Sequence, residues 1–232
     1  MSKNKGKIEV VVVSVGGSLI VPENIDVAFL LSLKNLIRKG IKKRKKFIII
    51  TGGGKTARNY QQASKAITKL RSEDVDWLGI HATRMNAQLV KTILLPHVEE
   101  RIVHDPNEPI VWKKPILIAG GWKPGWSTDY DAVLLAKRFK AKKLINLSNI
   151  DYVYDRDPWI HADAKRIERI IWKEFRRIIP KKWDPGLNSP FDPVASREAE
   201  KIGLEVAIIN GKKLEEIENF LSDKKFVGTL IR

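Results

Sequence analysis

Short apolar runs alternate with helix-like patterns along most of the chain. The runs are nearly continuous and rich in β-branched residues, which is typical of strands that are covered on both faces. The expected strands cover residues 8–15, 46–51, 115–120, 142–148 and 204–210. The expected helices cover residues 25–39, 55–70, 76–95, 129–140, 193–202 and 213–221. This alternation predicts a three-layer α/β/α sandwich around a mostly parallel central sheet.

Length and composition narrow the classes of protein. The 232 residues fit one large domain, and the absence of cysteine excludes a disulfide framework, a thiolate metal site and a cysteine nucleophile. The first apolar run, at 8–15, contains Glu9 and is too short to cross a membrane, so we expect a cytoplasmic protein. The proline-rich segment 180–192 is expected to be a linker or a lid.

The formal net charge of +16 raises the question of a nucleic-acid partner. The cations are dispersed, and the densest cluster, residues 38–46, lies where a helix is expected to end. No aromatic residue interleaves with this cluster, as single-strand binders require. We therefore favour a solvated helix end, while nucleic-acid binding remains an alternative that predicts a steep loss of affinity with salt.

Glycines gather where three expected strands end, in VGGS (15–18), TGGGKTAR (51–58) and AGGWKPGWSTD (119–129). In open α/β sheets, ligands bind at the carboxyl ends of the strands, and glycine there lets backbone N–H groups approach a phosphate. Each glycine pair alone is equally compatible with a tight turn. Ile49 stands where a P-loop needs glycine, and no dinucleotide-binding glycine motif follows a strand. Together, the turns predict a site for more phosphate than one mononucleotide offers.

Cations and polar residues accompany these turns. Lys55 and Arg58 lie one helical turn apart and either flank a phosphate at a helix N-terminus or are simply exposed. Helix 76–95 is expected to bury one apolar stripe and to present a polar face, which is either a recognition surface for a ligand with hydroxyls or an ordinary surface. The expected stripe is Leu78, Ala82, Met85, Leu89 and Ile93, and the polar face is Asp76, Gly79, Thr83 and Asn86.

Two acid-containing segments offer further chemistry. Thr128 and Asp131 match a capping box, which leaves Asp129 to organise cations for phosphoryl transfer. The segment 147–158 is either a hairpin with aspartate turns or a nucleotide contact. Its candidate contact residues are Asn149, Asp151, Tyr152, Tyr154 and Asp157.

The segments GGGKTAR, GIHATRMNA, GGWKPGWSTD and NIDYVYDRDP, in this order, resemble the amino acid kinase superfamily, and within it the uridylate (UMP) kinases of the archaeal-like branch. The resemblance covers essentially the whole chain. It implies ATP and UMP as partners, Mg²⁺ with ATP as cofactor, phosphoryl transfer to UMP in pyrimidine nucleotide biosynthesis, and a homohexamer. It also implies one domain over residues 1–232, with an acceptor-binding part at roughly 1–140 and an ATP-binding part at roughly 141–232.

The resemblance implies site residues. Those for ATP are Gly17, Ser18, Gly54, Arg58, Ser148, Asn149, Tyr154 and Asp157. Those for UMP are Gly53, Asp76, Trp122, Lys123, Pro124, Gly125, Trp126, Ser127 and Thr128. Asp129 matches an acid that positions catalytic lysines, and Arg58 and Lys55 are the candidate catalytic cations. No protein side chain is assigned to the metal.

The chain also departs from its relatives. Ser14 stands where many superfamily members have a lysine, Tyr152 replaces a glycine, and Trp122 and Trp126 replace smaller or more polar residues. Two alternatives therefore accompany the UMP kinase hypothesis. One is another kinase of the superfamily, acting on carbamate, an acyl amino acid or isopentenyl phosphate. The other is a nucleotide-binding sensor or storage module without catalysis.

Overall fold

The computed structural model describes residues 8–158, 160–181 and 189–232, and in these ranges the chain forms a seven-stranded central sheet with strand order β3-β2-β1-β4-β8-β9-β7. Strands β8 and β9 run antiparallel, whereas the other neighbours in this sheet run parallel. The strands are β1 Glu9–Val15, β2 Lys45–Thr51, β3 Ile116–Ala119, β4 Lys143–Ser148, β7 Arg169–Ile170, β8 Glu205–Asn210 and β9 Thr229–Ile231.

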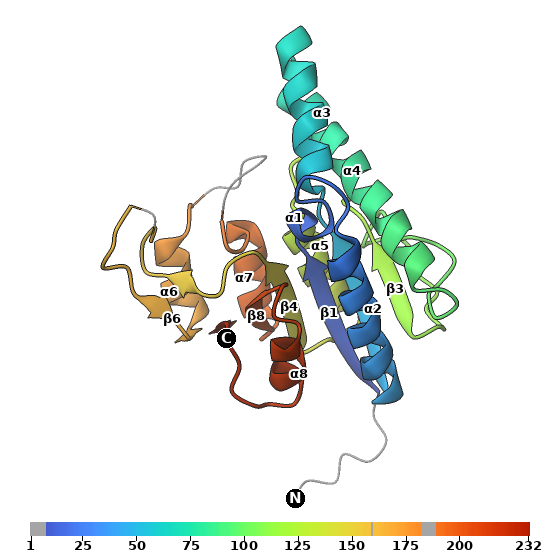
Figure 1. Ribbon diagram of the computed structural model, residues 1–232, viewed down its shortest axis with the longest axis vertical. Coiled ribbons are helices and arrows are strands. Elements are labelled where there is room, and N and C mark those ends of the chain that lie inside the picture. Colours follow the sequence, from blue (N-terminus) through green and yellow to red (C-terminus); the bar gives the residue numbers. More distant parts are fainter. Residues whose placement is uncertain (1–7, 159, 182–188) are drawn as a thin grey trace, which may run out of the picture.

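Helices cover both faces of the sheet, which confirms the predicted three-layer sandwich (Figure 1). One apolar core joins the sheet to α2 Val27–Lys42, α4 Ser72–Ile93 and α8 Glu215–Leu221. The other joins it to α5 Thr128–Arg138, α6 Trp172–Ile178 and α7 Pro193–Lys201. The short α1 Gly17–Ile20 and the helix α3 Gly54–Ile67 follow β1 and β2. Within the described ranges, none of these helices combines the length and the apolar character of a membrane span.

Both faces of each central strand are buried, which explains the continuous apolar runs. In β1, Val11 and Val13 face the core that contains α2, while Val12 faces the core that contains α5. Successive strand side chains point to opposite faces, so a strand covered on both sides has no polar face. The polar interruptions at Ser14 and Asn146 are therefore exceptions within buried strands.

The sequence did not reveal every element. Helix α6 and the short strands β5 Val153–Tyr154, β6 Arg166–Ile167, β7 and β9 were not expected. Strands β5 and β6 pair antiparallel, so the hairpin that we had considered within 147–158 instead joins residues 153–154 to 166–167, beyond the end of that segment. Of the predicted lid 180–192, residues 182–188 lie outside the described residues. At its end, the carbonyl of Pro190 accepts a hydrogen bond from Asn146 Nδ2 at 3.2 Å.

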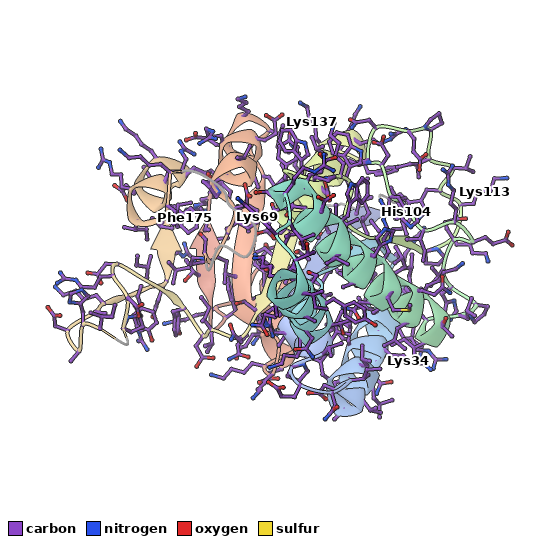
Figure 2. The ribbon with its side chains drawn as sticks, turned by 90° about the horizontal axis from the view of Figure 1, so that it is seen from above. Lys34, Lys69, His104, Lys113, Lys137 and Phe175 are labelled. Atoms are coloured by element: carbon purple, nitrogen blue, oxygen red, sulfur yellow. The ribbon has the colours of Figure 1, made fainter. Side chains whose placement is uncertain are left out.

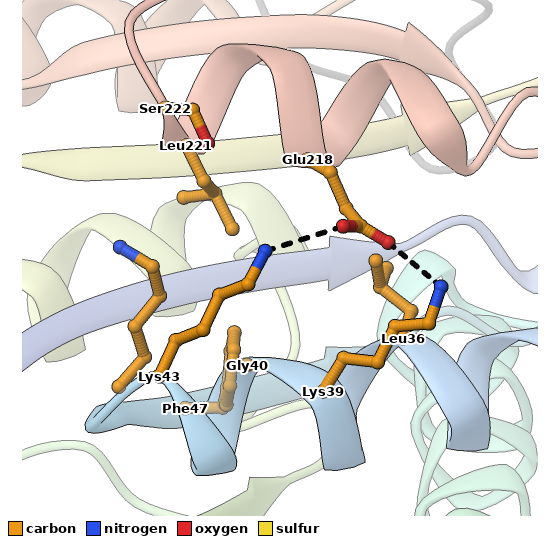
Figure 3. A pocket seen from close by; sticks show the side chains of 9 residues that line it. Leu36, Lys39, Gly40, Lys43, Phe47, Glu218, Leu221 and Ser222 are labelled. Atoms are coloured by element: carbon orange, nitrogen blue, oxygen red, sulfur yellow. Dashed lines mark hydrogen bonds and ion pairs between the residues drawn. The ribbon is translucent and has the colours of Figure 1, made fainter.

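The basic cluster 38–46 lies at the C-terminal end of α2, where Glu218 of α8 pairs with Lys39 and Lys43 at 3.1 and 3.4 Å (Figure 3). The hollow between these helices measures only about 20 Å³, which is enough for a single water molecule. Elsewhere, the labelled Lys34, Lys113 and Lys137 lie on different sides of the molecule (Figure 2). These positions agree with a helix end packed on its neighbour rather than with one continuous binding stripe.

Candidate active site

The glycine turns lie together at the carboxyl edge of the sheet. Strands β1, β2 and β3 are parallel neighbours, so the turns that follow them emerge on the same side. Strand β1 pairs with β2 on one side and with β4 on the other. Strands β2 and β3 therefore lie on one side of β1, and β4 lies on the other. In parallel sheets, ligands bind at the carboxyl ends of the strands where the strand order reverses in this way.

The first two turns touch through their backbones. A side chain on Gly17 would collide with the backbone nitrogen of Gly54, and a side chain on Gly52 would approach the nitrogen of Gly17 to 2.6 Å. Gly54 also has a φ of +63°, a conformation that favours glycine. On the other side, Gly16 N donates to the carbonyl of Leu147 at 2.9 Å. Only glycine therefore permits this contact between the turns after β1 and β2.

Helix α3 begins at the same edge of the sheet, and its first turns contain Lys55 and Arg58. Arg58 Nη1 donates to Ser18 Oγ at 3.4 Å, so the structure brings two of the proposed ATP contacts together. Lys55 instead pairs with Glu23 at 3.2 Å, in the loop after α1. Unpaired backbone N–H groups and the helix dipole make such a terminus favourable for a phosphate.

Helix α4 anchors the second and third turns, which corrects our interpretation of its polar face. Asn86 Nδ2 donates to the carbonyl of Gly52 at 2.7 Å, and Thr83 Oγ1 accepts from Gly121 N at 2.7 Å. Both side chains are buried, so they are neither a ligand-recognition surface nor ordinary surface residues. Their burial is compatible with their polarity because each is hydrogen-bonded to backbone.

The predicted apolar stripe of α4 is wrong at Met85, which is 68% exposed. The buried residues of this helix are Val75, Ile80, Ala82, Thr83, Asn86, Ala87 and Val90. Apolar periodicity selected the neighbouring stripe because it could not recognise that polar residues would occupy part of the buried face.

Asp76 lies at the acceptor loop, 120–127. Its Oδ2 accepts a hydrogen bond from Gly125 N at 2.9 Å, and Gly125 has a φ of +85°. The carboxylate is only half-buried. The structure thus brings together the acid and the loop that the resemblance connects with UMP.

The acceptor loop carries a ladder of aromatic rings. Trp122 stacks on Trp126 with ring centroids 6.1 Å apart, and Trp126 stacks on Tyr130 at 4.3 Å. Lys123 Nζ lies 4.0 Å from the centre of the Trp122 ring, a cation–π contact. These half-buried rings stiffen the loop and offer a flat apolar surface beside Asp76.

The capping box expected at the start of α5 is wrong. The N-cap is Ser127, whose hydroxyl accepts from Tyr130 N at 3.2 Å, and Thr128 is the first residue inside the helix. Asp131 does not reach back to the cap. It points into the protein, is 1% exposed and accepts from Trp122 N at 3.0 Å. The motif failed because Asp131 is recruited by the loop backbone rather than by its own helix.

Asp129 lies two residues before Asp131 in α5 and faces β1 and β4. It accepts from Ser14 Oγ at 3.2 Å, from Asp192 N at 3.2 Å and from Asn146 Nδ2 at 3.5 Å. Burial, together with the nearby carboxylate of Asp192, raises the pKa of Asp129 to about 7. In the part of the chain that the structure describes, no lysine bonds to this carboxyl group, and Ser14, the position at which the resemblance led us to expect a lysine, lies beside it.

Of these neighbours of Asp129, the sequence analysis had noted Ser14, as the position where many relatives have a lysine, but had not named Asn146 or Asp192. Asn146 interrupts an apolar strand, as Ser14 does, which is the signal that could have found it. Asp192 caps α7 by accepting from Val194 N and Ala195 N at 2.6 Å. A cap is a common helix feature, so its proximity to Asp129 becomes visible only in the fold.

The remaining candidates surround the carboxyl end of β4. Ser148 ends the strand, exposed Asn149 follows it, and Tyr154 lies in β5. Asp151 accepts from Lys213 Nζ at 2.7 Å and from Asn210 Nδ2 at 2.8 Å. The hydrogen bonds from Lys213 and Asn210 lower the pKa of Asp151. The end of β8 adds Asn210 and the loop after it adds Lys213, neither of which the sequence analysis had named, while Asp157 lies between β5 and β6.

A parallel sheet that gathers glycine turns and helix N-termini at one carboxyl edge is the architecture of an α/β phosphate-binding protein. Within that class, the chain belongs to the amino acid kinase family, whose model matches residues 9–106 and 110–210.

Individual relatives are more specific. The chain is 34% identical over 224 residues to a uridylate kinase of Thermococcus kodakarensis, which covers 95% of this chain and 98% of the relative. It is 32% identical over 226 residues to a uridylate kinase of Thermoplasma acidophilum, with 96% of each chain covered. The crystal structure of a uridylate kinase from Archaeoglobus fulgidus superposes with a TM-score of 0.80 at 26% identity, covering 96% of this chain and 99% of that one.

Proposed function

We propose that this protein is a uridylate kinase, which transfers the γ-phosphoryl group of ATP to UMP and releases ADP and UDP. The observation that carries the proposal is the similarity to archaeal uridylate kinases along 95% of the chain. The contact between Asp76 and the acceptor loop supports it, because a carboxylate beside a flat aromatic surface suits a ribose next to a base.

The proposed reaction is an in-line displacement. A phosphate oxygen of UMP attacks the γ-phosphorus of ATP, the new P–O bond forms, and the bond to the bridging oxygen of ADP breaks. A phosphate monoester dianion is already nucleophilic, so no general base is required. Catalysis then depends on positioning and on electrostatic stabilisation by backbone N–H groups and cations.

Mg²⁺ accompanies ATP in this proposal and would neutralise charge between the phosphates. Among the described residues, no three His, Asp or Glu side chains are grouped to enclose a metal. Mg²⁺ in such sites is held mainly by substrate phosphates and water, with one or two carboxylates, so a site in which backbone N–H groups bind the phosphates does not need side chains that enclose the metal. We assign to the Asp129 carboxyl group, at the carboxyl edge of the sheet, the role of positioning cations beside the phosphates.

The residue assignments give both nucleotides contacts in the turns after β1 and β2, UMP the segments around β3, and ATP the segments around β4. We assign UMP to Gly53, Asp76 and residues 122–128, and ATP to Gly17, Ser18, Gly54, Arg58, Ser148, Asn149, Tyr154 and Asp157. Arg58 and Lys55 are the proposed catalytic cations, Lys55 after release from Glu23. The proposal extends to a homohexamer in the cytoplasm, as the family resemblance implies, and light scattering measures the oligomeric state.

A panel of acceptors tests the function. With ATP and Mg²⁺, we expect kcat/KM for UMP to exceed that for CMP, carbamate, an acyl amino acid and isopentenyl phosphate by about tenfold or more. Transfer to CMP or to a carboxylate acceptor at the rate found for UMP would contradict the assignment. Binding of ATP and UMP without turnover would instead identify a sensor or storage module, which the Ser14–Asp129 contact makes a specific alternative.

A further inference from the structure

The peptide units of Gly121 and Trp122 are bound by side chains at every polar backbone atom. Gly121 N donates to Thr83 Oγ1 at 2.7 Å, and Trp122 N donates to Asp131 Oδ2 at 3.0 Å. Arg84 donates to both carbonyls, from Nε to Gly121 at 3.2 Å and from Nη2 to Trp122 at 2.9 Å. Two helices, α4 and α5, therefore fix the start of the acceptor loop.

Arg84 and Asp131 are the two ionisable side chains of this arrangement. The guanidinium of Arg84 is half-buried, and burial lowers its pKa whereas the nearby Asp131 raises it. Asp131 is buried with one carboxyl oxygen, Oδ1, unpaired in the structure. A buried polar group with an unpaired atom costs stability, and the adjacent Ala132 and Val133 are fully buried apolar residues. Packing alone therefore does not account for an aspartate at position 131.

The bound peptides set the course of the rest of the acceptor loop. Trp122 begins the ring ladder that continues to Trp126, and four residues beyond Gly121 the loop is bound again, through Gly125 N to Asp76. The loop is thus fixed at two points, by Arg84 and Asp131 at its start and by Asp76 at Gly125. The positions of the Trp122 ring and of Lys123, whose Nζ lies over that ring, therefore depend on the first anchor.

We propose that Arg84 and Asp131 are positioning residues for acceptor binding, which clamp the Gly121–Trp122 peptides from the carbonyl and amide sides and thereby fix the acceptor loop. The inference rests on the proposed function, since it assigns the clamp to UMP. Neither side chain contacts a reacting atom, so the clamp acts through the loop.

The test compares Arg84→Met, Arg84→Lys, Asp131→Ala and Asp131→Asn with Arg138→Met. Arg138 is a matched control because its Nη1 donates to two loop carbonyls, of Pro106 and Glu108, at 2.9 and 2.6 Å. Asn at position 131 retains an acceptor for Trp122 N, whereas Ala does not. Lys at position 84 keeps the charge but loses the fork that reaches two carbonyls.

Amide hydrogen exchange of the free protein tests the clamp without any substrate. We expect faster exchange in a peptide spanning residues 120–127 in Arg84→Met and Asp131→Ala, and faster exchange near residues 105–109 in Arg138→Met. Unchanged exchange over 120–127 in both clamp variants would overturn the inference. This outcome is independent of whether UMP is the acceptor.

Kinetics test the consequence. We expect Arg84→Met and Asp131→Ala to raise the KM for UMP by about fivefold or more, with the KM for ATP changed by less than about twofold. Arg84→Lys should be intermediate, and Asp131→Asn and Arg138→Met should stay within about twofold of the wild type. Equal increases in both KM values, or a failure of Asn to rescue position 131, would overturn the positioning role. If the wild type does not phosphorylate UMP, the proposed function fails, and the exchange experiment still decides whether the clamp exists.

Discussion

Two neighbouring carboxyl groups of α5, Asp129 and Asp131, show how burial decides the chemistry of a single residue. Asp129 lies at the carboxyl edge of the sheet and accepts hydrogen bonds from Ser14 and from the backbone of Asp192. Asp131 lies inside the protein, where burial, and to a smaller extent Asp105, Asp129 and Asp192, raise its pKa to about 8, although the bond from Trp122 N opposes this shift. At neutral pH, Asp131 is therefore mainly protonated in the folded protein.

This protonation predicts a pH dependence of stability. An ordinary aspartate in the unfolded chain has a pKa of 3.8, so unfolding releases a proton from Asp131 between about pH 4 and pH 8. Its contribution to the free energy of unfolding therefore falls as pH rises through this window, by about 1.4 kcal/mol per pH unit. Asp131→Asn cannot ionise and should lose this slope, which urea unfolding at several pH values measures.

A control keeps this measurement specific. Asp74 is an aspartate whose pKa is lowered by its hydrogen bond to Arg71, so Asp74→Asn should not flatten the decline above about pH 5. Parallel stability profiles for the wild type and Asp131→Asn would show that Asp131 is already ionised at neutral pH.

At the scale of elements, helix starts position several groups of the site. Asp26 caps α2 by accepting from Phe29 N at 2.8 Å, Asp192 caps α7 beside Asp129, and Ser127 caps α5 at the end of the acceptor loop. The last of these differs from the sequence prediction by one residue. The difference matters because it turns Asp131 away from the cap and toward Trp122.

The corrected cap leads to a paired prediction. Ser127→Ala removes the acceptor for Tyr130 N and should lower the free energy of unfolding by about 1 kcal/mol. Thr128→Ala, one residue further along, leaves the cap intact and should change it by no more than about 0.5 kcal/mol. Urea denaturation of both variants measures the difference, and a larger loss for Thr128→Ala would restore the original capping box.

At the scale of the whole molecule, the order of the strands divides the candidate residues between the two sides of β1. The chain builds β1, β2 and β3 in one direction and then returns to the other side of β1 with β4 and β8. Asp76 and the acceptor loop belong to the first direction, and Ser148, Asn149 and Lys213 to the second. The γ-phosphoryl group would pass between them, above the glycine turns that follow β1 and β2.

This division predicts opposite effects from variants on the two sides. Asp76→Ala should raise the KM for UMP about tenfold, which is about 1.4 kcal/mol, and leave that for ATP nearly unchanged. Asn149→Ala, on an exposed residue of the other side, should raise the KM for ATP and spare that for UMP. Steady-state kinetics with each substrate varied in turn decides this, and equal effects of either variant on both substrates would contradict the division into parts at roughly 1–140 and 141–232.

The sequence by itself determined the layers and the edge of the sheet at which the glycine turns gather. Continuous β-branched runs are typical of strands that are buried on both faces. In a parallel sheet, the glycines that follow such strands all lie at its carboxyl edge. The main strands, the longer helices and the glycine turns were therefore predictable, as was the family. Asp76 and the acceptor loop were named separately, and the fold brought them within hydrogen-bonding distance.

Only the tertiary structure decided which polar residues turn inward. Thr83 and Asn86 are buried because loop backbones from distant parts of the chain supply their partners, and Asp131 because the loop before its own helix does. Periodicity contains no information about such partners. The same reason explains Ser14, Asn146 and Asp192, which come from three separate segments and meet at Asp129. Local patterns thus specify which face of an element is apolar, whereas the hydrogen bonds that anchor the acceptor loop exist only after the sheet has brought those segments together.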